Sequence, residues 1–346
     1  MPIIQGGMGV GVSMCKLAAA TARAGGLGVV AAVGLGYDAA DKSNDYLGAN
    51  IRGLRYHLRE AREHAEGGAL GVNIMVALSD YGSYARAAAE EGVDVIFSGA
   101  GLPMTLPEFL PEGSKTKLVP IISSHRAATL LCKKWLAKYN RLPDGFVVEG
   151  PLAGGHLGFR PELLDDPDYQ LEKLIPEVVE AVKIFEDKTG TKIPVVAAGG
   201  VFTGADIAKF FTLGAAGVQL GTRFVATEEC DASDAFKQAY VDSKPEDVII
   251  IKSPVGLPGR AIKSPFTHSV AQGERKPVRC PYKCIVTCEA EESDYCIALA
   301  LLNARVGNFD RGFAFAGANV HRVDKIITVQ ELIDSLLEEY REACQS

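Results

Sequence analysis

One histidine of this chain has neighbours that suggest a chemical role. His156 follows Gly154 and Gly155, shortly after an apolar stretch of strand length at residues 145–149. An imidazole with a pKa near neutrality can take a proton from a carbon atom or orient a carbonyl group. We therefore predict that His156 is a catalytic residue.

Two glycine-containing segments predict an anion site. Residues 194–201 have the sequence PVVAAGGV and residues 217–224 have GVQLGTRF, with a helix-like segment between them. Glycine lets a ligand approach the backbone closely, and N–H groups at a helix start favour an anion. Adjacent sites of this kind on consecutive strand ends suit a phosphate, although close strand–helix packing also explains the glycines. The groups predicted to hold the phosphate belong to Gly199, Gly200, Gly221 and Thr222.

The chain alternates between apolar runs of strand length and segments with helical spacing. Nearly continuous hydrophobicity is typical of strands buried on both faces of a parallel sheet. Eight alternations favour a closed barrel over an open doubly wound sheet, whose glycine-rich turn is poorly matched by residues 6–12. The predicted fold is therefore α/β, a TIM (β/α)8 barrel with a C-terminal loop-and-helix extension. The predicted strands are residues 3–6, 27–33, 70–76, 93–98, 118–123, 145–149, 194–199 and 217–224. The predicted helices are residues 16–24, 53–66, 81–91, 126–138, 171–188 and 205–213.

Beyond residue 224 the alternation stops. Residues 244–282 are rich in Pro, Gly, Lys and Ser, so we expect a loop or short hairpin there and no regular helix. Further helices are expected at residues 294–305 and 329–342. We predict two parts, a barrel at 1–243 and an extension at 244–346. The extension comprises an excursion over the barrel mouth, a cysteine-rich segment and C-terminal helices.

Composition narrows the class of protein. The chain has 346 residues, 47% of them hydrophobic, and a formal net charge of −7, which argues against nucleic acid as a partner. No apolar run reaches membrane-spanning length, and the first residues lack the features of a signal peptide. We therefore expect a cytoplasmic protein with a small-molecule substrate and no membrane partner. The sequence leaves open whether two copies form a homodimer.

The spacing of four cysteines in the extension is unusual. Cys280, Cys284, Cys288 and Cys296 are separated by three, three and seven residues. Zinc sites usually contain paired Cys-x2-4-Cys units, and common iron–sulfur segments use two-residue spacings. Reduced, partly buried thiols or a redox-labile patch explain the cysteines better than a metal or Fe–S centre, so no metal site is predicted.

Five motifs together resemble a known family. Residues 2–8 (PIIQGGM), 71–75 (GVNIM), 153–156 (AGGH), 197–200 (AAGG) and 219–224 (QLGTRF) are similar to segments of the nitronate monooxygenase family, formerly 2-nitropropane dioxygenase. That family includes related FMN-dependent enoyl-ACP reductases. The resemblance covers roughly residues 1–265 in order and spacing. It implies a TIM barrel that binds FMN at the strand carboxyl ends. Members either oxidise nitronates with oxygen or pass hydride from NAD(P)H to an acceptor.

The resemblance also implies roles for individual residues. The amide of Asn73 can donate and accept at the edge of the flavin ring, and His156 matches a base in the monooxygenases or a substrate-positioning group in the reductases. This chain has Leu152 where the family often has Glu, a carboxylate that could tune the histidine or bind a cation, and this difference leaves the substrate open. Glu149 could replace part of that role, although an ordinary solvated carboxylate explains it equally well. The predicted cofactor-binding residues are Gly6, Gly7, Met8, Asn73, Glu149, Gly155, Gly199, Gly200, Gly221 and Thr222.

Three functions remain open at this point. The preferred one is an FMN-dependent oxidoreductase that oxidises alkyl nitronates with oxygen. The alternative is an enoyl-ACP (enoyl-thioester) reductase of the same family, with NAD(P)H as reductant. The third is a flavin electron carrier in which the four cysteines hold a metal. A nucleotide dehydrogenase of the IMP dehydrogenase type is disfavoured, because its catalytic cysteine loop is replaced by Gly-Gly-His-Leu-Gly at residues 154–158.

Overall fold

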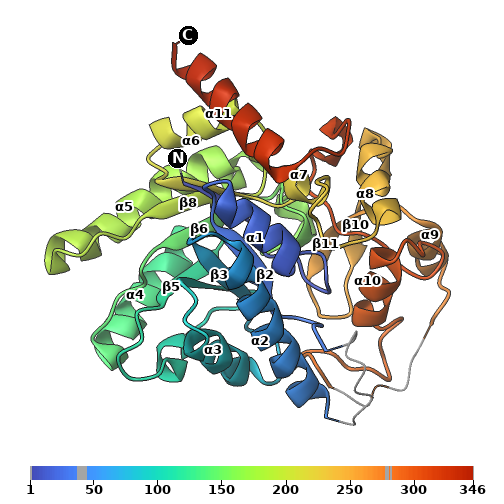
Figure 1. The fold of residues 1–346 in the computed structure, drawn as a ribbon, viewed down its shortest axis with the longest axis horizontal. Helices are drawn as coiled ribbons and strands as arrows, with labels where there is room; N and C mark the ends of the chain where they lie inside the picture. The colour runs from blue at the N-terminus through green and yellow to red at the C-terminus, as the bar shows by residue number, and fades with distance from the viewer. Residues whose placement is uncertain (1, 37–44, 277–279, 281–282, 346) are drawn as a thin grey trace.

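Eight parallel strands form one sheet in the computed structural model, which describes residues 2–36, 45–276, 280 and 283–345 (Figure 1). The spatial order is β1-β9-β8-β6-β5-β4-β3-β2. Leu27, directly before β2, exchanges backbone hydrogen bonds with β1, through Ile3 O at 2.9 Å and Gln5 N at 3.0 Å, so the sheet nearly closes into a barrel. All eight predicted strands and the TIM-barrel prediction are confirmed. The strands are β1 (Ile3–Gln5), β2 (Gly28–Ala31), β3 (Leu70–Met75), β4 (Val95–Gly99), β5 (Lys117–Ile122), β6 (Phe146–Glu149), β8 (Val195–Ala198) and β9 (Gly217–Leu220).

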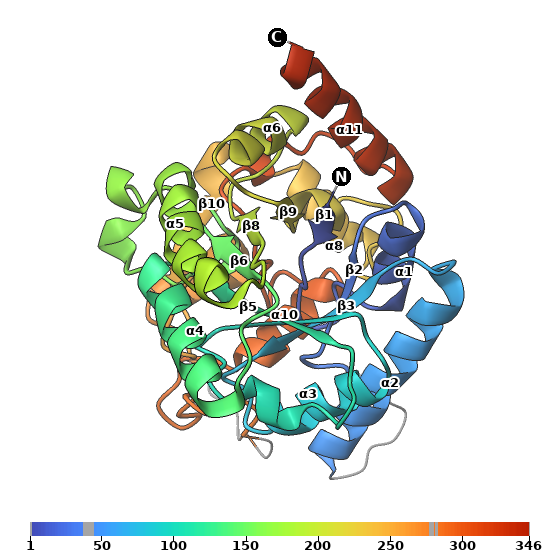
Figure 2. The same ribbon diagram turned by 90° about the vertical axis from the view of Figure 1, so that its left-hand side faces the viewer.

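Helices surround the strands (Figure 2). Each buries an apolar face against the sheet, and the Thr203 side chain caps the N-terminus of α6 by accepting the Asp206 N–H. The last helix, α11 (Val329–Gln345), packs against α6 and α1. The helices described between the strands are α1 (Cys15–Arg23), α2 (Tyr46–His64), α3 (Tyr81–Glu90), α4 (His125–Tyr139), α5 (Leu171–Thr189) and α6 (Gly204–Thr212). No helix of the described residues is long and apolar enough to cross a membrane.

The barrel has an inner and an outer core. Alternate strand residues such as Val29, Phe97 and Val147 form a buried cluster separate from the larger cluster that joins strands to helices. This is the arrangement expected when successive side chains of a strand point to opposite faces. The interior is therefore packed with side chains and leaves room for a ligand only at an end.

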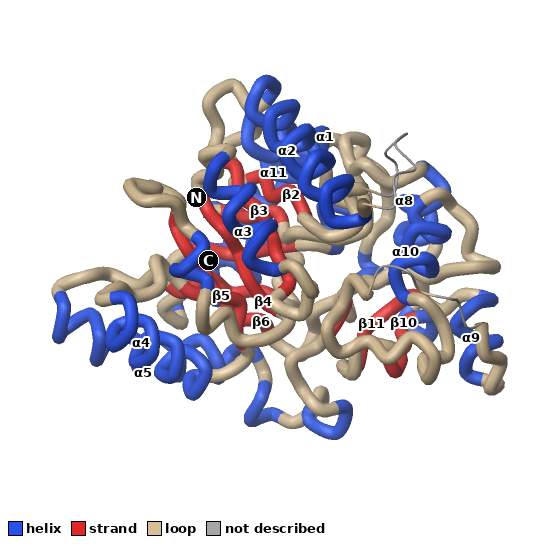
Figure 3. Tube along the Cα trace, turned by 90° about the horizontal axis from the view of Figure 1, so that it is seen from below, coloured by secondary structure: helices blue, strands red, loops and turns tan. Residues whose placement is uncertain are grey.

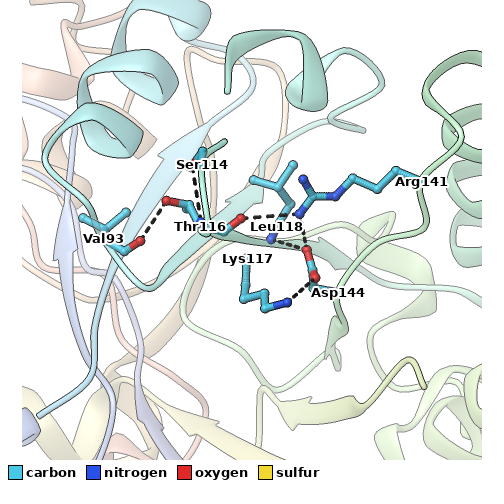
Figure 4. Close-up of polar contacts among 7 residues, drawn as sticks. All are labelled: Val93, Ser114, Thr116, Lys117, Leu118, Arg141 and Asp144. Carbon is cyan, nitrogen blue, oxygen red and sulfur yellow. Dashed lines mark hydrogen bonds and ion pairs between the residues drawn. The ribbon is translucent and has the colours of Figure 1, made fainter. Parts of the chain in front are cut away.

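Polar contacts hold the amino ends of the central strands (Figure 4). Asp144 accepts the Leu118 N–H at 2.9 Å, the Lys117 ammonium at 3.1 Å and a hydrogen bond from Arg141. Burial by itself would raise the pKa of the Asp144 carboxyl, but the bonds from Leu118 and Arg141 bring it below its ordinary value. Thr116 donates to Val93 O at 2.9 Å and links β5 to the start of β4. This end of the barrel is built for stability.

The described residues between β9 and α11 lie at the opposite end (Figures 1 and 3). It contains α7 (Thr222–Val225), α8 (Asp234–Val241), β10 (Val248–Lys252), β11 (Pro258–Ile262), α9 (Pro265–Ala271) and α10 (Ile297–Arg305). The predicted hairpin is confirmed, because β10 and β11 pair antiparallel, and β11 also pairs with the two-residue strand β7 (Gly155–His156). Short 3-10 helices occur at Leu106–Phe109, Pro161–Leu163, Pro167–Tyr169, Pro245–Asp247 and Val320–Arg322.

One expectation for the excursion was wrong. We expected no regular helix within residues 244–282, but α9 forms there. Pro265 is its first residue, where proline's missing N–H costs nothing, and Ser264 caps it by accepting the Thr267 N–H. The boundary predicted at residue 243 stays a prediction.

Candidate functional site

A cavity of about 310 Å³ opens at the carboxyl ends of the barrel strands. The structure brings every predicted site residue to its wall. Those residues are Gly6, Gly7, Met8, Asn73, Glu149, Gly155, His156, Gly199, Gly200, Gly221 and Thr222. Their individual roles stay predictions.

One end of the cavity is lined by backbone. Gly199 and Gly200 have φ angles of +77° and +129°, which an L side chain rarely adopts, so glycine is required at this turn. Thr222 begins α7, and the first N–H groups of a helix have no partner within it. Its hydroxyl accepts the Gly317 N–H at 3.0 Å and retains a proton to donate. This end offers N–H and O–H donors of the kind that bind a phosphate.

The neighbouring wall is flat because side chains are missing from it. A Cβ at Gly7 would lie 2.2 Å from Asn73 Cβ, so only glycine lets the loop after β1 pass beside Asn73. An added Cβ at Gly155 would meet nothing within 4 Å, which marks open space. Within the described residues, the Asn73 amide has no hydrogen bond to protein and is free to bind a ligand. These features fit a planar ring with polar edges.

His156 is held by a residue of the excursion. Its Nε2 lies 2.7 Å from Ser253 Oγ, and its ring meets the Phe315 ring edge-on at 5.0 Å. Ser253 Oγ also accepts the Val255 N–H at 3.4 Å, and we assign the Ser253 hydroxyl as the donor to His156 Nε2. Nδ1 then carries the ring proton. Burial lowers the pKa of His156 to about 4, which keeps the imidazole neutral.

Glu149 lies on the wall of the same cavity. Within the described residues its carboxyl makes no hydrogen bond or ion pair to the protein. Burial, with no compensating cation, raises its pKa to about 7. An unpaired carboxyl with a raised pKa in a cleft is a recognised indicator of a functional site.

Several residues of the site were missed by the sequence. Ser253, Phe315, Gly317 and Asn319 all come from beyond the barrel strands, and Asn319 Nδ2 donates to Gly200 O at 3.0 Å. The one available signal was the proline-rich excursion, which predicted a covering segment but no particular contact. His125, the first residue of α4, does not line the cavity, and its Nδ1 lies 3.1 Å from Glu177 Oε2.

The cysteine-rich segment reaches the cavity at one point. Cys284 lines the wall and hydrogen-bonds through its carbonyl to Ser79 N at 3.2 Å. In the part of the chain that the structure describes, no group of three or more His, Cys, Asp or Glu side chains is placed to hold a metal ion. The four cysteines are free, and the electron-carrier alternative gains no support from their geometry.

Comparison with known proteins gives the family. The nitronate monooxygenase family model matches residues 1–339, well beyond the limit near residue 265 set by the motifs. A probable nitronate monooxygenase of Staphylococcus saprophyticus is 29% identical over 293 residues, 78% of this chain and 77% of that protein. A Mycobacterium tuberculosis protein, (3aS,4S,5R,7aS)-5-hydroxy-7a-methyl-1-oxo-octahydro-1H-indene-4-carboxyl-CoA dehydrogenase, is 30% identical over 274 residues, 79% of this chain; the match spans 66% of its own length.

Solved structures agree with this result. FabK from Thermotoga maritima superposes with a TM-score of 0.74 at 28% identity, covering 99% of this chain and 94% of that one. A nitroalkane oxidase from Streptomyces ansochromogenes has the same fold, with a TM-score of 0.74 at 24% identity and coverage of 99% and 96%. From its motifs, its barrel and the family match, the chain belongs to the nitronate monooxygenase family of oxidoreductases.

Proposed function

We propose that this chain binds FMN and reduces the carbon–carbon double bond of a neutral enoyl thioester with NAD(P)H as the electron source. When bound, FMN would supply reversible two-electron chemistry. Gly199, Gly200, Gly221 and Thr222 would hold its phosphate. Gly6, Gly7, Met8, Gly155 and Asn73 would hold its ring.

The cavity fits that cofactor on two observations of this chain. The positive φ angles of Gly199 and Gly200 keep the phosphate end free of side chains, and Asn319 fixes the turn through Gly200 O. The open space above Gly155 and the unpaired Asn73 amide match a flat, polar-edged ring. A side chain on the Gly199–Gly200 turn would fill the space predicted for the phosphate.

The contact between His156 and Ser253 is the observation that favours a thioester over a nitronate as substrate. With Nε2 bound at 2.7 Å and a pKa near 4, His156 is poorly suited to take a proton as a base. Its remaining Nδ1–H is suited to donate a hydrogen bond to a carbonyl oxygen. This supports the substrate-positioning role of the reductases over the base of the monooxygenases.

The charge of the cavity supports the same choice. Among the described residues, no lysine or arginine lines it, and its one carboxyl group is Glu149. A nitronate is an anion, and away from the N–H and O–H donors of the phosphate end the cavity wall offers it no cation. A thioester carries no charge at its reacting carbons, and Val255, Ile285, Ile297 and Leu301 form an apolar wall for its chain. The M. tuberculosis relative is named for a carboxyl-CoA substrate, which is also a thioester.

Oxidation of alkyl nitronates is the second candidate. It is favoured by the family match and by the relative from S. saprophyticus. The two candidates differ in what donates electrons to the cofactor, because a nitronate is itself the donor and a thioester needs NAD(P)H.

Anaerobic stopped-flow absorbance separates them. In separate experiments, the FMN-loaded protein is mixed with a small alkyl nitronate and with NADH or NADPH. Rapid bleaching by a pyridine nucleotide and none by the nitronate is the expected result. Bleaching by the nitronate alone would replace our proposal with the second candidate.

A further inference from the structure

We propose that Glu149 is a second catalytic residue, the acid that gives the substrate its proton, and that it does more than contact the cofactor. This inference rests on the proposed thioester reduction. Glu149 is the last residue of β6, and its side chain enters the cavity that His156 also lines. It is therefore placed at the carboxyl end of a barrel strand, where barrel enzymes carry their reacting groups.

The surroundings of Glu149 favour the neutral, proton-bearing form of the carboxyl over the carboxylate. The neighbouring strand β8 presents Ala198 beside it, and α5 presents Leu171 against Gly150. The titratable groups on the cavity wall are Tyr46, His156, Tyr240 and Cys284, and none of them is a cation at neutral pH. Burial is accordingly the cause that raises the pKa of Glu149 to about 7.

The buried cation Arg260 is bound to backbone oxygens. Arg260 donates hydrogen bonds to the carbonyl oxygens of Pro151 and Ala153, in the loop between Glu149 and His156. It thus fixes the loop and leaves the Glu149 carboxyl without a salt bridge. A carboxyl with a pKa near the working pH can both give a proton and be recharged by water.

The two cavity groups then have separate tasks. His156 is already bound through Nε2 and has a pKa near 4, so it holds no proton that it can readily give up as an acid. Its Nδ1–H would orient the thioester carbonyl. Glu149, which has no partner in the described part of the chain, is the group able to move a proton.

The proton and electron balance is simple. The β-carbon of the double bond receives a hydride that originates in NAD(P)H. The π electrons move to the α-carbon, which forms a C–H bond with the Glu149 proton as the carboxyl O–H bond breaks. Glu149 is left as a carboxylate and takes a proton from water before the next turnover. The substrate gains two electrons and two hydrogens.

Glu149→Gln tests the inference by three measurements on the FMN-loaded protein. Infrared difference spectra through a pH titration should show a protonated carboxyl band in the wild type with a midpoint near pH 7, and the band should vanish in E149Q. Turnover with an enoyl thioester should fall by about a hundredfold or more, and the loss of rate at high pH should disappear. Bound FMN should stay at wild-type occupancy, because glutamine fills the same volume.

Other results would overturn the inference. A band with the midpoint of an ordinary glutamate, or a turnover that is unchanged in E149Q, would remove Glu149 as the acid. Loss of FMN from E149Q would make Glu149 a cofactor contact only. Glu162→Gln, at an exposed carboxyl, is the matched control and should leave all three readouts unchanged. If the wild type turns over no enoyl thioester, the proposed function is wrong. The infrared midpoint tests the protonation of Glu149 independently of turnover.

Discussion

Two carboxyl groups near the ends of strand β6 have opposite surroundings. Asp144, before the strand, accepts hydrogen bonds from Leu118, Lys117 and Arg141, and its pKa lies below the ordinary value. Glu149, at the other end, has no such partners among the described residues, and burial raises its pKa to about 7. The paired carboxyl stabilises the barrel, whereas the unpaired one costs stability and is available for chemistry. The Asp144 carboxyl at the amino end is hydrogen-bonded to protein, whereas the Glu149 carboxyl at the other end has no partner among the described residues.

The largest expected effect is at the reactive end. His156→Ala should retain FMN but lower turnover by about a hundredfold, because the substrate loses its hydrogen-bond donor. Steady-state rates and flavin absorbance of the purified variant measure both quantities. His125→Ala, outside the cavity, is the control. Unchanged turnover in His156→Ala would remove this residue from the mechanism.

Asp144→Asn should have the reverse pattern. An amide in place of the carboxylate loses the ionic bonds to Arg141 and Lys117, and we expect about 2 kcal/mol less free energy of unfolding. Urea unfolding provides that value, and turnover per folded molecule should not change. Asp187→Asn, at an exposed position of α5, is a matched control with little expected effect. If Asp144→Asn instead lost turnover without losing stability, the division between the two ends would be wrong.

At the phosphate end, Thr222→Val should weaken FMN retention by about tenfold, the scale of one hydrogen bond to a charged group. The variant also removes the acceptor of the Gly317 N–H, which holds the loop beside the cradle. Ultrafiltration followed by flavin absorbance gives the dissociation constant. Thr212→Val, on the exposed side of α6, should retain FMN fully. Full occupancy in both variants would contradict the phosphate assignment.

The smallest effect concerns stability and pH. The pKa of Glu149 is raised in the folded protein, so the folded state resists ionisation and loses stability as pH rises from the unfolded value through about 7. Glu149→Gln should therefore raise the melting temperature by a few degrees at about pH 8 and by less at about pH 5. Calorimetry of the protein at both pH values measures this. An equal gain at both would mean that Glu149 has an ordinary pKa.

The barrel could be predicted because its signals are local. The apolar run of β8 and the glycines that follow it are consecutive in sequence, and only glycine is suited to the positive φ of Gly199 and Gly200. The same holds for Thr203, whose cap lies within four residues of its partner. Where one short segment determines the local structure, that structure could be predicted from the sequence.

The contacts that decide chemistry are long-range and could not be predicted. Ser253 is 97 residues from His156, and Asn319 is 119 residues from Gly200. Sequence reasoning left His156 as either a base or a positioning group, because the choice depends on which ring nitrogen Ser253 occupies. Similarly, the pKa of Glu149 depends on the absence of a nearby cation, which only the folded arrangement reveals.

The most direct test is whether the reduced protein gives its electrons to a neutral thioester. FMN-loaded protein, reduced chemically without oxygen, is mixed with a 2-enoyl thioester in a stopped-flow instrument, with the saturated thioester as control. We predict that the oxidised flavin spectrum returns with the enoyl compound and not with the saturated one. Two results together would contradict this mechanism. The reduced flavin would stay bleached with every enoyl thioester, and a nitronate would bleach the oxidised flavin of the same protein.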